Sequence, residues 1–171
     1  EESWNQRFKQ DLGIDQVHWL DHGHLEGDDT DGHVDTLARF VAQDTIVYQG
    51  CEDVDDSHYQ QLHKMAAQLV SLKQVNGKPY KLHALPLPQP IYDEGEHDDD
   101  GRRLPAGYAN FLIANSVVLV PQYDDPADAE ALKIIAACFP EREVVGLDCM
   151  PLIRQNGAIH CAAMQIPKEF K

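Results

Sequence analysis

The apolar positions of this chain switch repeatedly between helical and strand-like spacing. Intervals of three and four residues predict helices over 3–12, 58–72, 126–139 and, as a short turn, 150–155. Alternating or compact apolar runs bounded by turn residues predict strands over 14–20, 33–42, 45–48, 79–87, 107–113, 117–120, 143–147 and 158–166. Strands and helices that alternate in this way indicate a mixed α/β (α+β) fold.

One segment of this pattern occurs twice. Residues 40–47 match residues 111–118, so the second copy lies 71 positions after the first. Each copy continues into an acidic helix start, an amphipathic helix and a strand, and 158–166 would begin a third copy. A unit of this size cannot bury its own faces, so we expect the units to be arranged in a ring or array. If that ring needs more copies than this chain holds, further copies lie outside this sequence.

The most polar stretch of the chain lies between the first two predicted strands. Eight ionisable side chains fall within fourteen positions: His22, His24, Glu26, Asp28, Asp29, Asp31, His33 and Asp35. Gly27 and Gly32 interrupt them, since glycine permits positive φ and close backbone approach. His33 and Asp35 stand two apart at the head of a predicted strand, which would point both to one face. A histidine beside a carboxylate favours acid/base chemistry and cation binding.

Two other interpretations of this stretch are open. It is an ordinary solvated acidic loop, or its first six ionisable residues hold a metal ion of a hydrolase. Calcium binding of the EF-hand type fails, because the register that uses Gly32 as the invariant glycine puts Gly27 and Ala38 where acids are needed.

The net charge of −15 and the pI near 4.8 argue against nucleic acid or an anionic membrane as partner. A small cationic substrate fits this field better. No apolar run approaches the roughly 18 residues of a membrane span, and the first residues do not resemble a secretory signal. The four cysteines form no Cys-x-x-Cys pair, which predicts reduced thiols and a cytoplasmic protein.

Residues 86–105 predict a long, mobile, acidic and proline-rich loop. It carries Pro86, Pro88 and Pro90, followed by an acidic run over 93–100.

Three motifs in order give the chain a specific resemblance: Gly27-Asp28-Asp29-Thr30-Asp31-Gly32-His33-Val34-Asp35, Leu104-Pro105-Ala106-Gly107-Tyr108-Ala109-Asn110-Phe111 and Gly157-Ala158-Ile159-His160-Cys161. The chain resembles the agmatine deiminase and bacterial peptidylarginine deiminase-like family of the guanidine-modifying (pentein) superfamily. The resemblance implies a five-bladed β/α propeller. It covers residues 1–171 as one domain that corresponds to the C-terminal half of the family's length, roughly the last two to three blades.

The resemblance also implies roles for four residues. Cys161 takes the place of the family's nucleophile, His33 that of its general acid/base, and Asp35 that of a carboxylate that grips the guanidinium. Asp29 lies near the family's substrate-binding acids. No metal and no cofactor are implied, and a further guanidinium-binding aspartate would come from a missing N-terminal half.

The sequence departs from the family's pattern at two places near these motifs. The glycine-rich run before the cysteine is reduced to Asn156-Gly157, and Gly107 stands where the family often has serine. Both changes leave the catalytic groups in place but would alter the pocket.

The implied activity is hydrolysis of agmatine to N-carbamoylputrescine and ammonia, a step of putrescine biosynthesis, through an amidino-cysteine. Deimination of peptidyl or free arginine is the first alternative. The second is an inactive fragment that lacks part of the site, and a homo-oligomer is compatible with either. Without the resemblance, Cys161 would be a buried structural cysteine of a strand and His160 a packing or hydrogen-bonding residue. Tyr108 and Asn110 would line a pocket or pack in the core.

Overall fold

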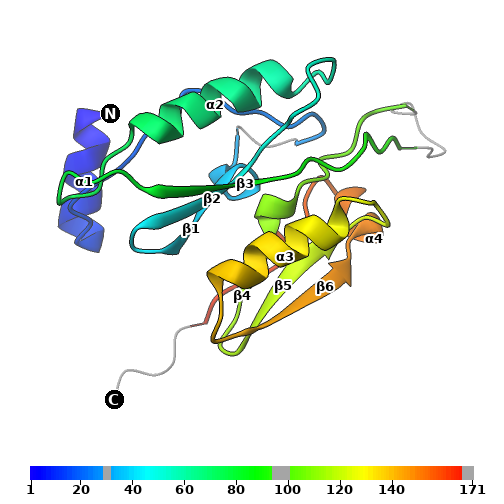
Figure 1. Cartoon of the computed structure of the whole chain (residues 1–171). Helices are drawn as coiled ribbons and strands as arrows, with labels where there is room; N and C mark the ends of the chain where they lie inside the picture. Colours follow the sequence, from blue (N-terminus) through cyan, green and yellow to red (C-terminus); the bar gives the residue numbers. More distant parts are fainter. Residues whose placement is uncertain (29–31, 94–100, 167–171) are drawn as a thin grey trace.

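Two units with the same order of elements follow one another in the computed structural model, which describes residues 1–28, 32–93 and 101–166 (Figure 1). The first unit contains β1 (Ala38–Ala42), β2 (Thr45–Gln49), α2 (Tyr59–Ser71) and β3 (Lys81–Leu85). The second contains β4 (Leu112–Ile113), β5 (Val117–Gln122), α3 (Asp128–Cys138) and β6 (Glu143–Asp148). The other elements are α1 (Glu2–Leu12), α4 (Met150–Ile153) and two single-turn 3-10 helices, η1 (Val34–Thr36) and η2 (Tyr108–Asn110).

The two sheets have identical topology. In each, the middle strand pairs antiparallel with the strand before it and parallel with the strand after the helix. Equivalent backbone bonds close both crossovers. Lys81 N–H donates to the Asp44 carbonyl at 2.8 Å, and Glu143 N–H donates to the Ser116 carbonyl at 3.1 Å. The repeat predicted from the sequence is therefore confirmed.

One helix covers one face of each sheet (Figure 1). The first unit buries Leu62, Met65 and Leu69 of α2, at helical spacing, against Leu37 and Ile46. This apolar stripe is the reason why the segment is helical in place, since packing of one face supplies most of a helix's stability in proteins.

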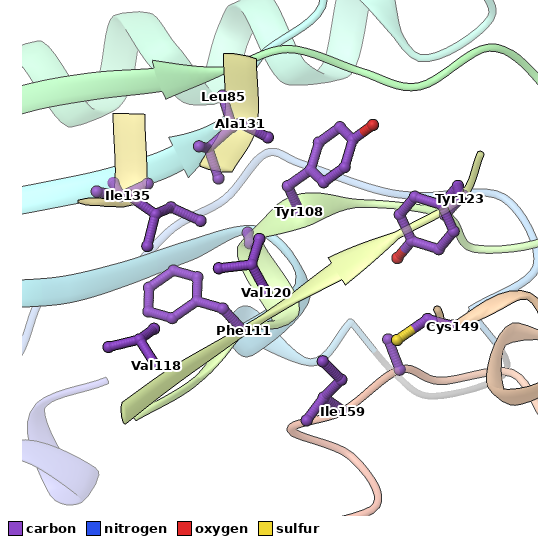
Figure 2. Close-up of a cluster of buried hydrophobic side chains, with 14 of the residues drawn as sticks. Leu85, Tyr108, Phe111, Val118, Val120, Tyr123, Ala131, Ile135, Cys149 and Ile159 are labelled. Carbon is purple, nitrogen blue, oxygen red and sulfur yellow. The ribbon is translucent and has the colours of Figure 1, made fainter. Parts of the chain in front are cut away.

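The larger core belongs to the second unit and also receives the last described segment of the chain (Figure 2). Phe111 and Val118 are fully buried in it, and Phe111 meets Phe139 edge to face with ring centroids 6.1 Å apart. Ala158 and Ile159 are 3% and 6% exposed in the same core. Burial of these two side chains fastens the chain immediately before Cys161.

A buried ion pair joins the loop before α2 to the segment that leads into η2. The Arg103 guanidinium donates to both carboxylate oxygens of Asp56, at 2.9 and 2.8 Å, and both side chains are 7% exposed. Nearby, the His58 Nε2 accepts the backbone N–H of Glu26 at 2.8 Å. Removing one partner of such a pair would leave an unpaired buried charge, so the two loops are held firmly together.

The predicted strand over 14–20 is wrong. No ladder forms there, because the Gln68 side chain satisfies the local backbone instead. Its amide donates to the Trp19 carbonyl at 3.0 Å and accepts the Asp21 N–H at 2.9 Å.

The strand predicted over 33–42 is wrong in its first half. Residues 34–36 form η1, because both the N–H and the hydroxyl of Thr36 donate to the His33 carbonyl, at 3.1 and 2.8 Å. Because this segment is not a strand, the prediction that His33 and Asp35 point to one face of a strand is also wrong.

The strand predicted over 158–166 is also wrong. The chain turns there, with Ala162 N–H donating to the Ala158 carbonyl at 3.2 Å, and no described strand lies beside it. Met164 and Ile166 are 87% and 88% exposed.

The loop predicted over 86–105 is only partly the solvated segment we expected. Its last three residues, 103–105, are buried, and Tyr92 forms an isolated antiparallel bridge with Arg103. Most of its acidic run, residues 94–100, lies outside the described residues. Within the described part of the chain, no helix is long and apolar enough to cross a membrane.

Of the described glycines, Gly27 leaves the least space for a side chain. It has φ of 81°, and an added Cβ would lie 2.3 Å from the Arg103 carbonyl oxygen. Gly77 has nearly the same φ, 80°, with nothing within 4 Å of such a Cβ. We expect Gly77→Ala to lower the free energy of unfolding by about 1 kcal/mol through backbone strain. We expect Gly27→Ala to cost about 1–3 kcal/mol more through overpacking. Urea denaturation of this chain measures both, and equal losses would contradict the close approach.

Candidate active site

Asp35 is brought to the site by η1. The turn places its side chain, 19% exposed, between the first unit and the backbone of η2 in the second. Its Oδ2 atom accepts hydrogen bonds from the His160 Nδ1 at 2.6 Å and from the Asn110 Nδ2 at 3.0 Å. The Cys161 thiol is also directed at Oδ2, at 3.8 Å.

Asn110 comes from η2 and is only 3% exposed. Its amide nitrogen donates to Asp35 and, at 3.2 Å, to the Cys161 sulfur. Its amide oxygen accepts the backbone N–H groups of His160 at 3.0 Å and of Cys161 at 3.3 Å. This one side chain therefore fixes the thiol, the carboxylate and the backbone that carries the thiol.

Cys161 lies in the turn that follows the buried pair Ala158 and Ile159. An added Cβ on Gly157 would lie 2.8 Å from the Cys161 Cβ and 3.1 Å from its sulfur, so the turn requires glycine there for lack of space. Cys161 is exposed, whereas Cys51 and Cys138 are half-buried and Cys149 is buried. Burial raises the pKa of the Cys149 thiol to about 11.

The surroundings keep Asp35 ionised. Partial burial alone would raise its pKa, but the hydrogen bond from His160 and the charge of that imidazole outweigh burial and hold the pKa below its ordinary value. A carboxylate in this state can bind a cation at neutral pH.

The same carboxylate disfavours a thiolate at Cys161. Partial burial of the thiol raises its pKa, and the negative charges of Asp35 and Asp28 raise it further. Hydrogen bonding by the Ala158 backbone and the Asn110 side chain opposes this without reversing it. These surroundings therefore favour the protonated thiol, and a positive ligand beside the sulfur would oppose that effect.

Arg39, on β1, holds the backbone on both sides of Asn110. Its Nη1 donates to the Phe111 carbonyl at 2.7 Å and to the Ala109 carbonyl at 3.5 Å, and its guanidinium lies 4.9 Å from the centre of the Phe111 ring. Burial lowers the pKa of Arg39, and the negative charges of Asp35 and Cys161 oppose that shift. The residue joins the first unit to η2 and places a cation close to Asp35.

The structure brings together two of the residues that the sequence singled out. Cys161 and Asp35, 126 positions apart, are in contact. His33 is exposed at the start of η1, two residues before Asp35. Asp29 lies outside the described residues. The expectation that Cys161 sits buried in a strand, drawn without the resemblance, is wrong.

The described residues do not support the interpretation of the acidic stretch as a metal site. Asp29 and Asp31 fall outside them, and the remaining four candidates, His22, His24, Glu26 and Asp28, do not converge. Across residues 1–28, 32–93 and 101–166, no three His, Cys, Asp or Glu side chains gather as metal ligands would.

Sequence reasoning underrated Asn110, His160 and Arg39. We expected His160 to pack or to make a hydrogen bond, and it does bond to Asp35. A signal for Asn110 existed: it is a polar residue inside an otherwise apolar run ending at Phe111, and such residues are buried only with partners. Nothing in the sequence marked Arg39, because its partners are backbone carbonyls of the other unit.

The fold and this arrangement define the class of protein, since solved guanidine-modifying deiminases have the same structure. A Porphyromonas gingivalis protein, solved under a provisional assignment as an arginine deiminase, is 50% identical, with a TM-score of 0.89 over 95% of this chain and 46% of its own. A substrate-bound cysteine-to-serine variant of the C. jejuni agmatine deiminase is 38% identical, with a TM-score of 0.83 over 94% of this chain and 44% of its own.

The chain belongs to the family of Porphyromonas-type peptidyl-arginine deiminases, whose model matches residues 1–167. The agmatine deiminase of Pseudomonas putida is 35% identical to it over 172 residues, which cover 94% of this chain and 46% of the relative. The chain thus spans about half the length of the curated relatives it matches. The resemblance identified from the sequence motifs is confirmed.

The electrostatics of the site make a prediction about thiol reactivity. We expect iodoacetamide to alkylate Cys161 before the other three cysteines, because only Cys161 is exposed. The midpoint of its rate against pH should lie at higher pH than the midpoint of an ordinary exposed thiol. Asp35→Asn removes the nearest negative charge and should move this midpoint to lower pH. Peptide mass spectrometry across a pH series measures both effects. A midpoint for Asp35→Asn at or above that of the unsubstituted chain would contradict the assigned role of the carboxylate.

Proposed function

We propose that this chain carries the nucleophile and one guanidinium-binding carboxylate of a deiminase that hydrolyses guanidinium groups. The observation that carries the proposal is the contact among Cys161, Asp35 and Asn110, which joins a thiol to a cation-binding carboxylate. The C. jejuni relative, which holds substrate when a cysteine is replaced by serine, supports it, because a cysteine nucleophile predicts that outcome.

The chemistry of the substrate explains why these groups are needed. A guanidinium is planar, positively charged and a poor electrophile, so a site must hold its nitrogens with carboxylates and attack its central carbon with a strong nucleophile. Asp35 is ionised and suited to hold the cation. The bound cation would in turn offset the negative charges that raise the pKa of Cys161, so that substrate binding itself favours the thiolate.

The proposed reaction has two steps. The Cys161 thiolate forms a bond to the guanidinium carbon, and one carbon–nitrogen bond breaks as ammonia leaves with a proton from His33. The substrate stays attached to the sulfur as an amidino-thioether. His33 then takes a proton from water, whose oxygen bonds to the same carbon, and the carbon–sulfur bond breaks to give a ureido product. No step uses a metal or a cofactor.

Agmatine is the substrate we propose first, giving N-carbamoylputrescine and ammonia, because the curated relatives are agmatine deiminases. Peptidyl or free arginine is the second candidate, which the description of the family model favours. The acidic character of the chain, with a net charge of −15, suits either cation.

The complete catalytic molecule is proposed to be a five-bladed propeller of which this chain supplies two repeats. The two identical β-β-α-β units and the relatives of about twice this length support the arrangement. Asp29 is proposed as a further substrate-binding acid, and another guanidinium-binding carboxylate would come from the other half. We also propose a cytoplasmic location and no nucleic-acid or membrane partner.

We expect this chain alone to release little or no ammonia from agmatine or an arginine peptide, whereas the chain extended to the length of its relatives should turn over one of them. In the extended chain, Cys161→Ala should abolish ammonia release, and Cys138→Ala, in α3, should not. Mass spectrometry of the working enzyme should find substrate minus ammonia on Cys161. Retained turnover in Cys161→Ala would remove the proposed nucleophile, and loss of turnover with a chelator would reopen the metal interpretation.

His33→Ala in the extended chain should lower the rate by about 10²-fold or more, the usual contribution of a general acid/base. Steady-state ammonia release measures the effect. A loss of less than about tenfold would assign the proton transfers to another group.

A further inference from the structure

His160 has no role in the reaction as proposed above, yet it makes the shortest polar contact of the site. Its Nδ1 lies 2.6 Å from the Asp35 Oδ2, at the short end of the range for hydrogen bonds between ionised groups. The side chains are 25% and 19% exposed, so solvent weakens the contact less than it would on the open surface.

The backbone of His160 holds the ring in place. Its N–H donates to the Asn110 side-chain oxygen at 3.0 Å and to the Asn110 carbonyl at 3.2 Å. The preceding residue, Ile159, is buried in the core of the second unit. The imidazole therefore approaches Asp35 from a backbone position that these contacts hold in place.

The contacts to Asp35 are unevenly distributed over its two oxygens. Among the described residues, the side chains of His160, Asn110 and Cys161 all direct their hydrogen bonds to Oδ2. Two strong donors on one oxygen fix the rotation of the carboxylate about its last bond. The other oxygen, Oδ1, takes none of these three contacts.

We infer that His160 is a positioning residue that acts through Asp35: its Nδ1–H holds Oδ2 so that Oδ1 is presented to the guanidinium of the substrate. The expected changes in KM rest on the proposed function. The hydrogen bond between His160 and Asp35 can be tested without any turnover. What positions the carboxylate is the donor at Nδ1, so an uncharged N–H at the same place should serve.

Two other roles for His160 give different results. If His160 only braces the turn before Cys161, any residue of similar size should serve equally. If its imidazolium instead competes with the substrate for Asp35, removing it should strengthen binding.

Three substitutions separate these roles in the chain extended to the length of its relatives. His160→Asn keeps an N–H donor close to the position of Nδ1, His160→Gln keeps one close to Nε2, and His160→Ala keeps neither. His63→Ala, at an exposed histidine of α2, is the matched control. We expect KM to rise at least about tenfold in the Ala and Gln variants, the effect of losing one charge-assisted hydrogen bond. We expect His160→Asn to stay within about threefold, and His63→Ala to match the unsubstituted enzyme.

A second measurement needs no activity and uses this chain as it stands. Carbon-13 NMR follows the Asp35 carboxyl during a pH titration, with Asp35→Asn to assign the signal. Because His160 lowers the pKa of Asp35, the midpoint should rise in His160→Ala. Arg39, whose charge also acts on Asp35, and Cys161, which contacts it, are unchanged in both samples.

The outcomes decide the inference separately from the proposed function. An unchanged Asp35 midpoint in His160→Ala overturns it, as do equal KM values in the Asn, Gln and Ala variants or a lower KM in any of them. If the extended chain turns over no guanidine compound, the proposed function fails, and the titration still decides whether His160 holds Asp35.

Discussion

The site depends on one buried amide, that of Asn110. Its nitrogen donates to the Asp35 carboxylate and the Cys161 sulfur, and its oxygen accepts two consecutive backbone N–H groups. A buried amide left without partners costs more free energy than a typical hydrogen bond contributes. The two segments that supply those partners, η1 and the turn that carries His160 and Cys161, are therefore held together by it. Each is also anchored by its own unit: η1 by the bonds of Thr36, and the turn before Cys161 by burial of Ile159.

The repeat explains why a site arises between the two units. A single-turn helix stands before the first strand of each, η1 before β1 and η2 before β4, and the two turns contact each other. Arg39 reinforces that contact by donating from β1 to the backbone around η2. A unit of three strands and one helix cannot bury both faces of its sheet, so its polar turns meet where neighbouring units pack.

Burial and the charges around the site set the protonation preferences of Asp35 and Cys161. The surroundings favour ionised Asp35 and disfavour ionised Cys161. A planar cation bound here would pair with the carboxylate and lower the free-energy cost of forming a thiolate beside it. This reciprocal dependence links the acidic composition of the chain to the guanidine chemistry of its family.

The sequence by itself determined the repeat, the helices over 58–72 and 126–139, the family, and Cys161, His33, Asp35 and Asp29 as candidates. These follow from local spacing and motifs. It misassigned 14–20, the first half of 33–42, the first half of 107–113, where η2 forms, and 158–166. A side chain outweighs strand-like composition at 14–20, a turn bond does so at 33–36, and no described strand lies beside 158–166. Only the tertiary structure decided that Asn110, His160 and Arg39 surround Asp35 and Cys161. Their contacts join residues 51 to 126 positions apart, and no local pattern encodes such a distance.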